Sequence, residues 1–179
     1  MSSDSWVLGR RVLDVARDVT VVLGEVAARL HESMEVLAFA SETRNHCRVY
    51  EVCRRDEPWS VGRDRLGALR PQGYTRIGPA LRHAMARAAK APTVRKLVIL
   101  VSDGKPTDYD RYEGRYGVDD IRQALREGEQ QGIVCHALAI DSQARTHLPE
   151  MFGPGAWHVL SDLTRLDDVM RATWGRIAH

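Results

Sequence analysis

The chain has 179 residues, of which 44% are hydrophobic and 28% are charged. This is ordinary globular composition, and the length predicts one domain over residues 1–179 with a core that needs no disulfide. The 26 basic and 24 acidic side chains leave a formal net charge of +2, without the basic excess typical of proteins that bind nucleic acids. Nucleic acid is therefore not an expected partner.

Signals for secretion and for membrane insertion are missing from the sequence. The longest apolar run, 97–101, is far too short to span a bilayer. The first residues lack the basic and apolar regions of a signal peptide. The three cysteines are an odd number without tight spacing, which argues against a disulfide framework. We expect a soluble, cytoplasmic protein with no membrane insertion.

The chain opens with a long helical pattern. Apolar residues at helical spacing predict a helix over 12–30, with Asp4 or Ser5 in front of it as a cap. A short apolar strand is predicted at 34–41. The alternating pattern at 47–53 predicts a second strand, at a sheet edge.

The middle of the chain contains the most apolar strand. A loop-like stretch with a short helix around 61–69 leads to an amphipathic helix over 77–90. The strand over 96–102 is apolar on both faces, so we expect it to be central and buried. A polar loop over 103–117 follows.

The remaining elements continue the alternation of helix and strand. A helix is predicted over 118–131, with Gly132 as its natural stop, and a buried strand over 133–140. Three shorter elements complete the chain: a helix near 143–151, a strand at 157–160 and a helix over 163–176. The alternation predicts an α/β fold, with a Rossmann-like, doubly wound and mostly parallel sheet flanked by helices.

Two polar clusters lie where such a sheet binds ligands, at the carboxyl ends of its strands. One is 102–108, in which Asp103 follows the most buried strand, and the other is 73–78, in which Thr75 opens a helix. Hydroxyls and a carboxylate are hard oxygen ligands that suit Mg²⁺ or Mn²⁺. Two plainer interpretations stay open, because Thr75 would also serve as a helix cap and Asp103 with its following glycine as an ordinary turn.

The loop after Asp103 holds a second group of candidates. Asp108, Tyr109, Tyr112 and Tyr116 crowd together there, and we interpret them as a surface that contacts a partner. The alternative is a solvated loop that packs on itself. Asp141, at another strand end, either supports the metal loop or caps a helix.

Other kinds of site find little support in the sequence. The spacings of the seven histidines and three cysteines fit no zinc pattern. No glycine-rich nucleotide motif is present, so the chain is not expected to bind ATP. Cys135 lies inside a predicted strand and is interpreted as a packing residue, although a cysteine–histidine nucleophile pair stays open.

An apolar strand ending in Ser-Asp-Gly at 102–104, a loop with Thr75 and an amino-terminal serine cluster resemble the von Willebrand factor A domain. Four segments resemble, more narrowly, the carboxyl-terminal domain of nitric oxide reductase activation proteins of the NorD type, with the rubisco-activase adaptors of the CbbO type as close relatives. These segments are 4–7, 73–82, 102–117 and 153–158. The resemblance implies a metal-ion-dependent adhesion site with Thr75 and Asp103 as ligands.

The chain departs from this family at its amino terminus. Aligned on segment 4–7, Ser2 takes the place of the last serine of the family's Asp-x-Ser-x-Ser element, and the aspartate would precede Met1. A register with Ser3 and Ser5 as the serine pair puts Met1 in place of the aspartate. Either register lacks that aspartate and the first, central strand, as in a chain started at an internal methionine. We expect weaker metal binding and an apolar slot between 34–41 and 96–102, with weaker folding, closure of the slot or its filling by another chain.

The resemblance implies a non-enzymatic adaptor that holds Mg²⁺ or Mn²⁺ at Ser2, Thr75 and Asp103, weakly if at all. The metal would recruit an acidic side chain of a target, and the adaptor would work with a hexameric AAA+ ATPase of the MoxR class. The expected target is nitric oxide reductase, during denitrification, or rubisco if the chain is of the CbbO type. The alternative is a metal-dependent hydrolase or phosphotransferase that uses Asp103, with Asp108 or Asp141 as the base. A remnant with neither activity is a third interpretation.

Overall fold

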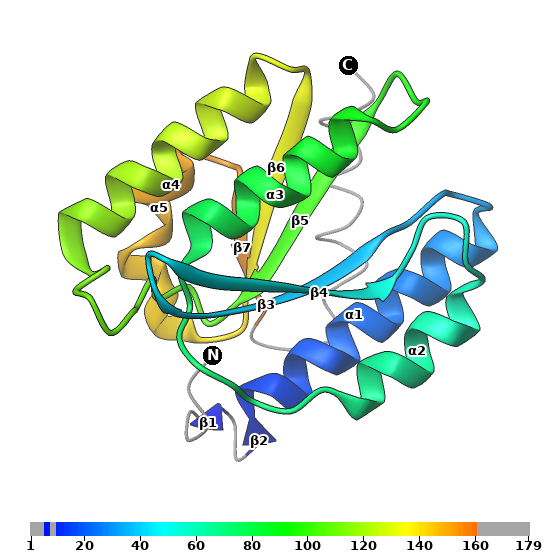
Figure 1. Cartoon of the computed structure of the whole chain (residues 1–179), viewed down its shortest axis with the longest axis horizontal. Helices are drawn as coiled ribbons and strands as arrows, with labels where there is room; N and C mark the ends of the chain where they lie inside the picture. Colours follow the sequence, from blue (N-terminus) through cyan, green and yellow to red (C-terminus); the bar gives the residue numbers. More distant parts are fainter. Residues whose placement is uncertain (1–5, 8–9, 161–179) are drawn as a thin grey trace.

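Strands and helices alternate through the computed structural model, which describes residues 6–7 and 10–160 (Figure 1). The strands are β1 (Trp6–Val7), β2 (Arg10–Arg11), β3 (Val36–Thr43), β4 (His46–Cys53), β5 (Lys96–Ser102), β6 (Ile133–Ala139) and β7 (Trp157–Val159). The helices are α1 (Val12–Arg29), α2 (Trp59–Ala68), α3 (Ile77–Ala89), α4 (Gly114–Glu129) and α5 (Leu148–Phe152), with a 3-10 turn η1 (Ser142–Thr146) before α5. None of the described helices is long and apolar enough to cross a membrane.

A parallel sheet in the order β5-β6-β7 forms the centre of the fold. Neighbouring side chains on a strand point to opposite faces of the sheet. A strand that is apolar on both faces therefore needs helices packed against both faces of the sheet. Leu100 and Ala137 pack into the core under α3 and α4, whereas Ile99 and Leu138 pack against α1. Figure 1 shows α3 and α4 side by side along β5 and β6, and α1 beside α2. The predicted α/β fold is confirmed.

The hairpin of β3 and β4 forms a separate, antiparallel sheet. Among the described residues β4 pairs only with β3, as the alternating pattern predicted for an edge. No described strand lies between β3 and β5. The gap has not closed, because a mostly apolar cavity of about 640 Å³ lies between these two strands.

Some element boundaries differ from the sequence prediction. Helix α1 begins at Val12 after the short β1–β2 pair, and its cap residue is Arg11, so the prediction of Asp4 or Ser5 as the cap was wrong. Both of those residues lie outside the described part of the chain. Helix α4 begins one turn before the predicted 118. This turn was not predicted because two of its four residues are glycine and its one aromatic residue, Tyr116, is exposed. The predicted helix over 163–176 also lies outside the described residues.

Helices α1 and α2 meet where a glycine receives an aromatic ring. A Cβ atom on Gly24 would overlap the indole of Trp59. The Trp59 Nε1–H donates to Glu25 Oε1 at 3.1 Å, which holds the ring in place. The contact therefore requires a residue without a side chain at position 24 of α1.

We expect Gly24→Ala to lower the free energy of unfolding by up to about 2 kcal/mol. Alanine favours a helix over glycine by about 1 kcal/mol, but overpacking against a fixed ring costs about 1–3 kcal/mol. Urea unfolding followed by circular dichroism measures the difference. Gly67→Ala in α2 is the matched control, since nothing lies within 4 Å of its Cβ, and it should be neutral or stabilising. An equal increase in the free energy of unfolding of both variants would contradict the packing described for Gly24.

Candidate functional site

The candidate site begins at the carboxyl end of β5, where Asp103 leaves the sheet. Gly104 adopts a left-handed conformation (φ 80°), which turns the chain sharply. The Asp103 Oδ1 atom accepts hydrogen bonds from Ser102 Oγ at 3.2 Å and from the backbone N–H of Lys105 at 3.3 Å. The Gly104 N–H in turn donates to Ser102 Oγ at 3.1 Å. The turn thus fixes the Asp103 carboxylate, and the residue as a whole is 8% exposed.

Thr75 lies against the same loop through backbone pairing. Its N–H donates to the carbonyl of Thr107 at 2.9 Å, and its carbonyl accepts from the Thr107 N–H at 3.2 Å. The preceding residue, Tyr74, pairs in the same way with Ser41 at the end of β3. The structure therefore joins the two polar clusters of the sequence and buries Thr75 between them. Because α3 is capped at Arg76 without a side-chain bond, the interpretation of Thr75 as its cap is wrong.

Charge distinguishes Asp103 from the other buried carboxylates of this region. In the described part of the chain no cationic side chain pairs with it within 4.0 Å. An ionised carboxylate that is shielded from water needs a compensating charge. With the Thr75 hydroxyl it supplies hard oxygen donors, which fit Mg²⁺ or Mn²⁺ with water completing the coordination. Among the described residues no three His, Cys, Asp or Glu side chains gather as a metal cluster, and Ser2 lies outside them.

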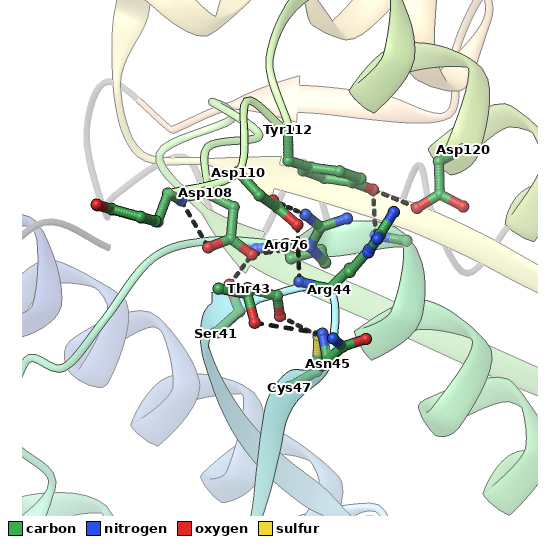
Figure 2. Close-up of polar contacts among 12 residues, drawn as sticks. Ser41, Thr43, Arg44, Asn45, Cys47, Arg76, Asp108, Asp110, Tyr112 and Asp120 are labelled. Atoms are coloured by element: carbon green, nitrogen blue, oxygen red, sulfur yellow. Dashed lines mark hydrogen bonds and ion pairs between the residues drawn. The ribbon is translucent and has the colours of Figure 1, made fainter.

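A buried arginine, Arg76, binds the loop that follows β5 (Figure 2). Arg76 Nε–H donates to Asp108 Oδ2 at 2.8 Å, and the guanidinium also pairs with Asp110. Its central carbon lies 4.2 Å from the centroid of the Tyr112 ring, a cation–π distance. Burial by itself would lower the pKa of Arg76, but the bond to Asp108 and the charge of Asp110 raise it overall. The hydrogen bond from the Arg44 N–H and the charge of Arg76 lower the pKa of Asp110.

Tyr112 continues the network from the loop to two helices. Its hydroxyl accepts a hydrogen bond from the Gly78 N–H of α3 at 3.0 Å and donates to Asp120 of α4. Asp120 also pairs with Arg82 of α3 at 2.7 Å. Burial and the bond to Asp120 raise the pKa of Tyr112 far above its ordinary value, so the phenol stays protonated. The loop is thereby fixed to α3 and α4.

Comparison with known proteins identifies the fold at this point. Residues 10–172 match the model of the von Willebrand factor type A (VWA) domain. The chain belongs to this family. The chain is also similar to the conserved hypothetical protein BatB of Bacteroides thetaiotaomicron, with a TM-score of 0.63 over 93% of this chain and 88% of that one. At 14% identity this likeness concerns the fold alone.

Curated relatives support the narrower resemblance. Protein NorD of Brucella suis biovar 1 (strain 1330) is 38% identical over 179 residues, which are 99% of this chain and 28% of that protein. Protein NorD of Stutzerimonas stutzeri is 38% identical over 164 residues, 90% of this chain and 27% of that protein. The resemblance to NorD proteins is thus confirmed. This VWA domain spans just over a quarter of the length of these relatives.

Of the four residues expected to contact a partner, two are exposed and two are buried. Tyr109 and Tyr116 are 76% and 56% exposed and stay candidates for that surface. Asp108 and Tyr112 are buried and bonded inside the protein, so their placement on the surface was wrong. A polar loop sequence suggests exposure, whereas here an arginine 32 positions upstream pulls the loop inward. Arg76 was not among the predicted site residues, and its position next to Thr75 was the available signal.

The residues considered for other chemistry have structural contacts. Asp108, a candidate base, pairs with Arg76, and Asp141 caps η1 by accepting from the Gln143 N–H at 2.9 Å. The capping interpretation of Asp141 is therefore confirmed. Packing in β6 desolvates the Cys135 thiol and raises its pKa to about 12, which disfavours a thiolate nucleophile. These contacts weaken the hydrolase alternative.

We expect Arg76→Ala to lower the free energy of unfolding by about 3–5 kcal/mol, because it leaves two carboxylates without their buried cation. Chemical unfolding at neutral pH measures the loss. The control is Arg115→Ala, since Arg115 is 93% exposed at its side chain and pairs with Asp119 only at the surface of α4. That change should stay within about 0.5 kcal/mol. A similar small loss in both variants would show that Arg76 does not hold the loop.

Proposed function

We propose that this VWA domain is a metal-dependent protein-binding module. The observation that carries the proposal is the buried Asp103, which has no cationic partner among the described residues and begins the loop that pairs with the buried Thr75 through Thr107. The other two aspartates of the loop, Asp108 and Asp110, already pair with Arg76. A divalent cation would supply the compensating charge and an open position for an oxygen ligand.

The chain's own residues would fix the geometry of recognition. Ser102 and the Lys105 N–H hold the Asp103 carboxylate, and pairing with Thr107 holds Thr75. A carboxylate of a partner protein is the expected ligand, because a hard cation prefers charged oxygen. Ser2, the third expected ligand, lies outside the described residues.

The similarity to NorD proteins supports a role for the whole protein. We propose that it is an adaptor without enzymatic activity, which works in the cytoplasm with a hexameric AAA+ ATPase of the MoxR class. The partner supplies ATP hydrolysis, and the target is nitric oxide reductase in denitrification, bound through an acidic side chain. Rubisco is the alternative target, by likeness to adaptors of the CbbO type.

We expect Mg²⁺ or Mn²⁺ to bind this chain and Asp103→Ala to abolish that binding, since the variant removes the charged ligand. Isothermal titration calorimetry on both proteins measures the effect. Asp119→Ala removes an exposed carboxylate of α4 and serves as the control, which should bind like the parent chain. Undiminished heat in Asp103→Ala would place the metal elsewhere, and no heat from the parent chain would contradict metal dependence of this chain.

Substitution of the two exposed tyrosines tests the proposed partner surface without changing the proposed metal ligands. We expect Tyr109→Ser combined with Tyr116→Ser to weaken binding to the MoxR-class ATPase by at least about tenfold, because aromatic side chains dominate such interfaces. Surface plasmon resonance in Mg²⁺ measures the affinity. Val94→Ser is the control. Val94 is exposed and lies just before the amino end of β5, at the opposite end of this strand from the tyrosines. Equal affinities would exclude these tyrosines from the interface.

A further inference from the structure

The loop that follows β5 alternates between inward-facing and exposed side chains over residues 108–113. The inward side chains all contact Arg76 (Figure 2). They are Asp108, Asp110 and Tyr112. The exposed side chains, which alternate with them, are Tyr109, Arg111 and Glu113. The inward set holds the loop to the protein, so the exposed set is available to contact another molecule.

Arg111 adopts a left-handed backbone conformation, with φ at 62°. This region is unfavourable for residues that carry a side chain. Arg111 is exposed, and its guanidinium has no carboxylate within 4.0 Å in the described part of the chain. The side chain therefore forms no ion pair there that would offset the strain. An arginine placed in this way is suited to contacts with another molecule.

A second arginine lies beside this part of the loop. The backbone N–H of Arg44, in the turn between β3 and β4, donates to Asp110 Oδ2 at 2.9 Å (Figure 2). Arg111 directly follows Asp110, so the backbones of the two arginines lie close to one carboxylate. Asp110 itself pairs with Arg76. Arg44 is exposed, and among the described residues no carboxylate lies within 4.0 Å of its guanidinium.

The charges around these two arginines are not balanced. Other exposed arginines nearby form ion pairs, such as Arg48 with Glu42 in the hairpin and Arg115 with Asp119 on α4. The loop over 103–113 has one exposed carboxylate, that of Glu113, and it pairs with neither of the two arginines within 4.0 Å. A molecule that brings negative charge would balance the two cations.

We propose that Arg44 and Arg111 bind an acidic segment of a partner protein, on the same loop that Asp103 begins. The inference rests on the proposed function, since it adds a second contact with the same partner. A guanidinium binds a carboxylate through two parallel hydrogen bonds, so two arginines suit a run of Asp or Glu. Tyr109, which is 76% exposed, adds an aromatic contact. A nucleic acid is the less suitable ligand, because the formal net charge is only +2.

A hexaglutamate peptide tests the proposal on the unaltered chain. Its binding is followed in ¹H–¹⁵N NMR spectra recorded in EDTA, which removes divalent cations, so the spectra report on the arginines and not on a metal. We expect the amide signals of 43–46 and 109–113 to shift as the peptide is added. Hexaglutamine, which has a similar shape without the charge, is the control peptide and should leave these signals in place.

Two double variants of equal net charge separate this pair of arginines from general attraction. Arg44→Gln with Arg111→Gln should raise the Kd of hexaglutamate by at least about fivefold, since both guanidinium contacts are lost. Arg54→Gln with Arg63→Gln removes two exposed cations, just after β4 and on α2, and should change the Kd by less than about twofold. An equal loss of affinity in both double variants would show attraction to net charge alone and overturn the proposal.

Arg111→Gly distinguishes binding from a structural role. Glycine adopts a φ of 62° without strain, so the midpoint of thermal unfolding should stay the same or rise. The Kd of hexaglutamate should rise by about twofold or more. A lower midpoint with an unchanged Kd would show that the side chain stabilises the fold and does not bind the peptide.

Other results would also overturn the proposal. No shift with hexaglutamate, or equal shifts with hexaglutamine, would show that the arginines do not recognise acidic side chains. Tighter binding of a single-stranded DNA at the same amides would identify a nucleic acid as the ligand. The proposed function fails separately, because a chain that gives no heat with Mg²⁺ in calorimetry would still bind hexaglutamate in EDTA.

Discussion

The buried guanidinium of Arg76 is the interaction on which the candidate site depends. The loop after β5 has no regular secondary structure up to α4, so its own backbone does not determine its course. Arg76 binds two of its carboxylates, Asp108 and Asp110, and Asp110 also accepts from the Arg44 N–H of the β3–β4 turn. One desolvated cation thus joins three segments that are distant in sequence. The cost of burying it is offset because its bonds are charge-assisted and its face is covered by Tyr112.

The same network gives Asp103 its distinct role. A single loop carries three aspartates, and two of them are neutralised by Arg76. Asp103 lies at the start of the loop, next to the turn at Gly104, and its hydrogen-bond donors, Ser102 Oγ and the Lys105 backbone N–H, are both neutral. A charged partner for Asp103 must therefore come from outside the described residues. This difference in charge balance, rather than the residue type, is the reason why Asp103 is the aspartate that we propose as a metal ligand.

Local patterns predicted the elements, whereas contacts over long sequence distances were not predictable. Apolar periodicity placed α1, α3, β5 and β6 because each buries a side or a face in the core. Tyr112 is buried because its ring packs against Arg76 and its hydroxyl bonds to Gly78, which lies 34 residues earlier in the chain. Local sequence patterns do not indicate contacts between residues so far apart. The early start of α4 was missed for a related reason, since its first turn contributes no apolar side chain to the core. The open gap beside β5 followed from the family resemblance alone.

Strand β5 links the apolar slot between β3 and β5 to the candidate site. Its last residue, Ser102, donates to Asp103 and accepts from the Gly104 N–H, so the position of the carboxylate depends on how firmly β5 is held. A strand with one free edge and partly buried side chains opens more readily than one paired on both sides. Movement of β5 would then also move Asp103, and the metal that we propose there, held by few charged ligands, would be sensitive to such movement. Filling the slot would therefore stiffen the support of the site without contacting the metal ligands.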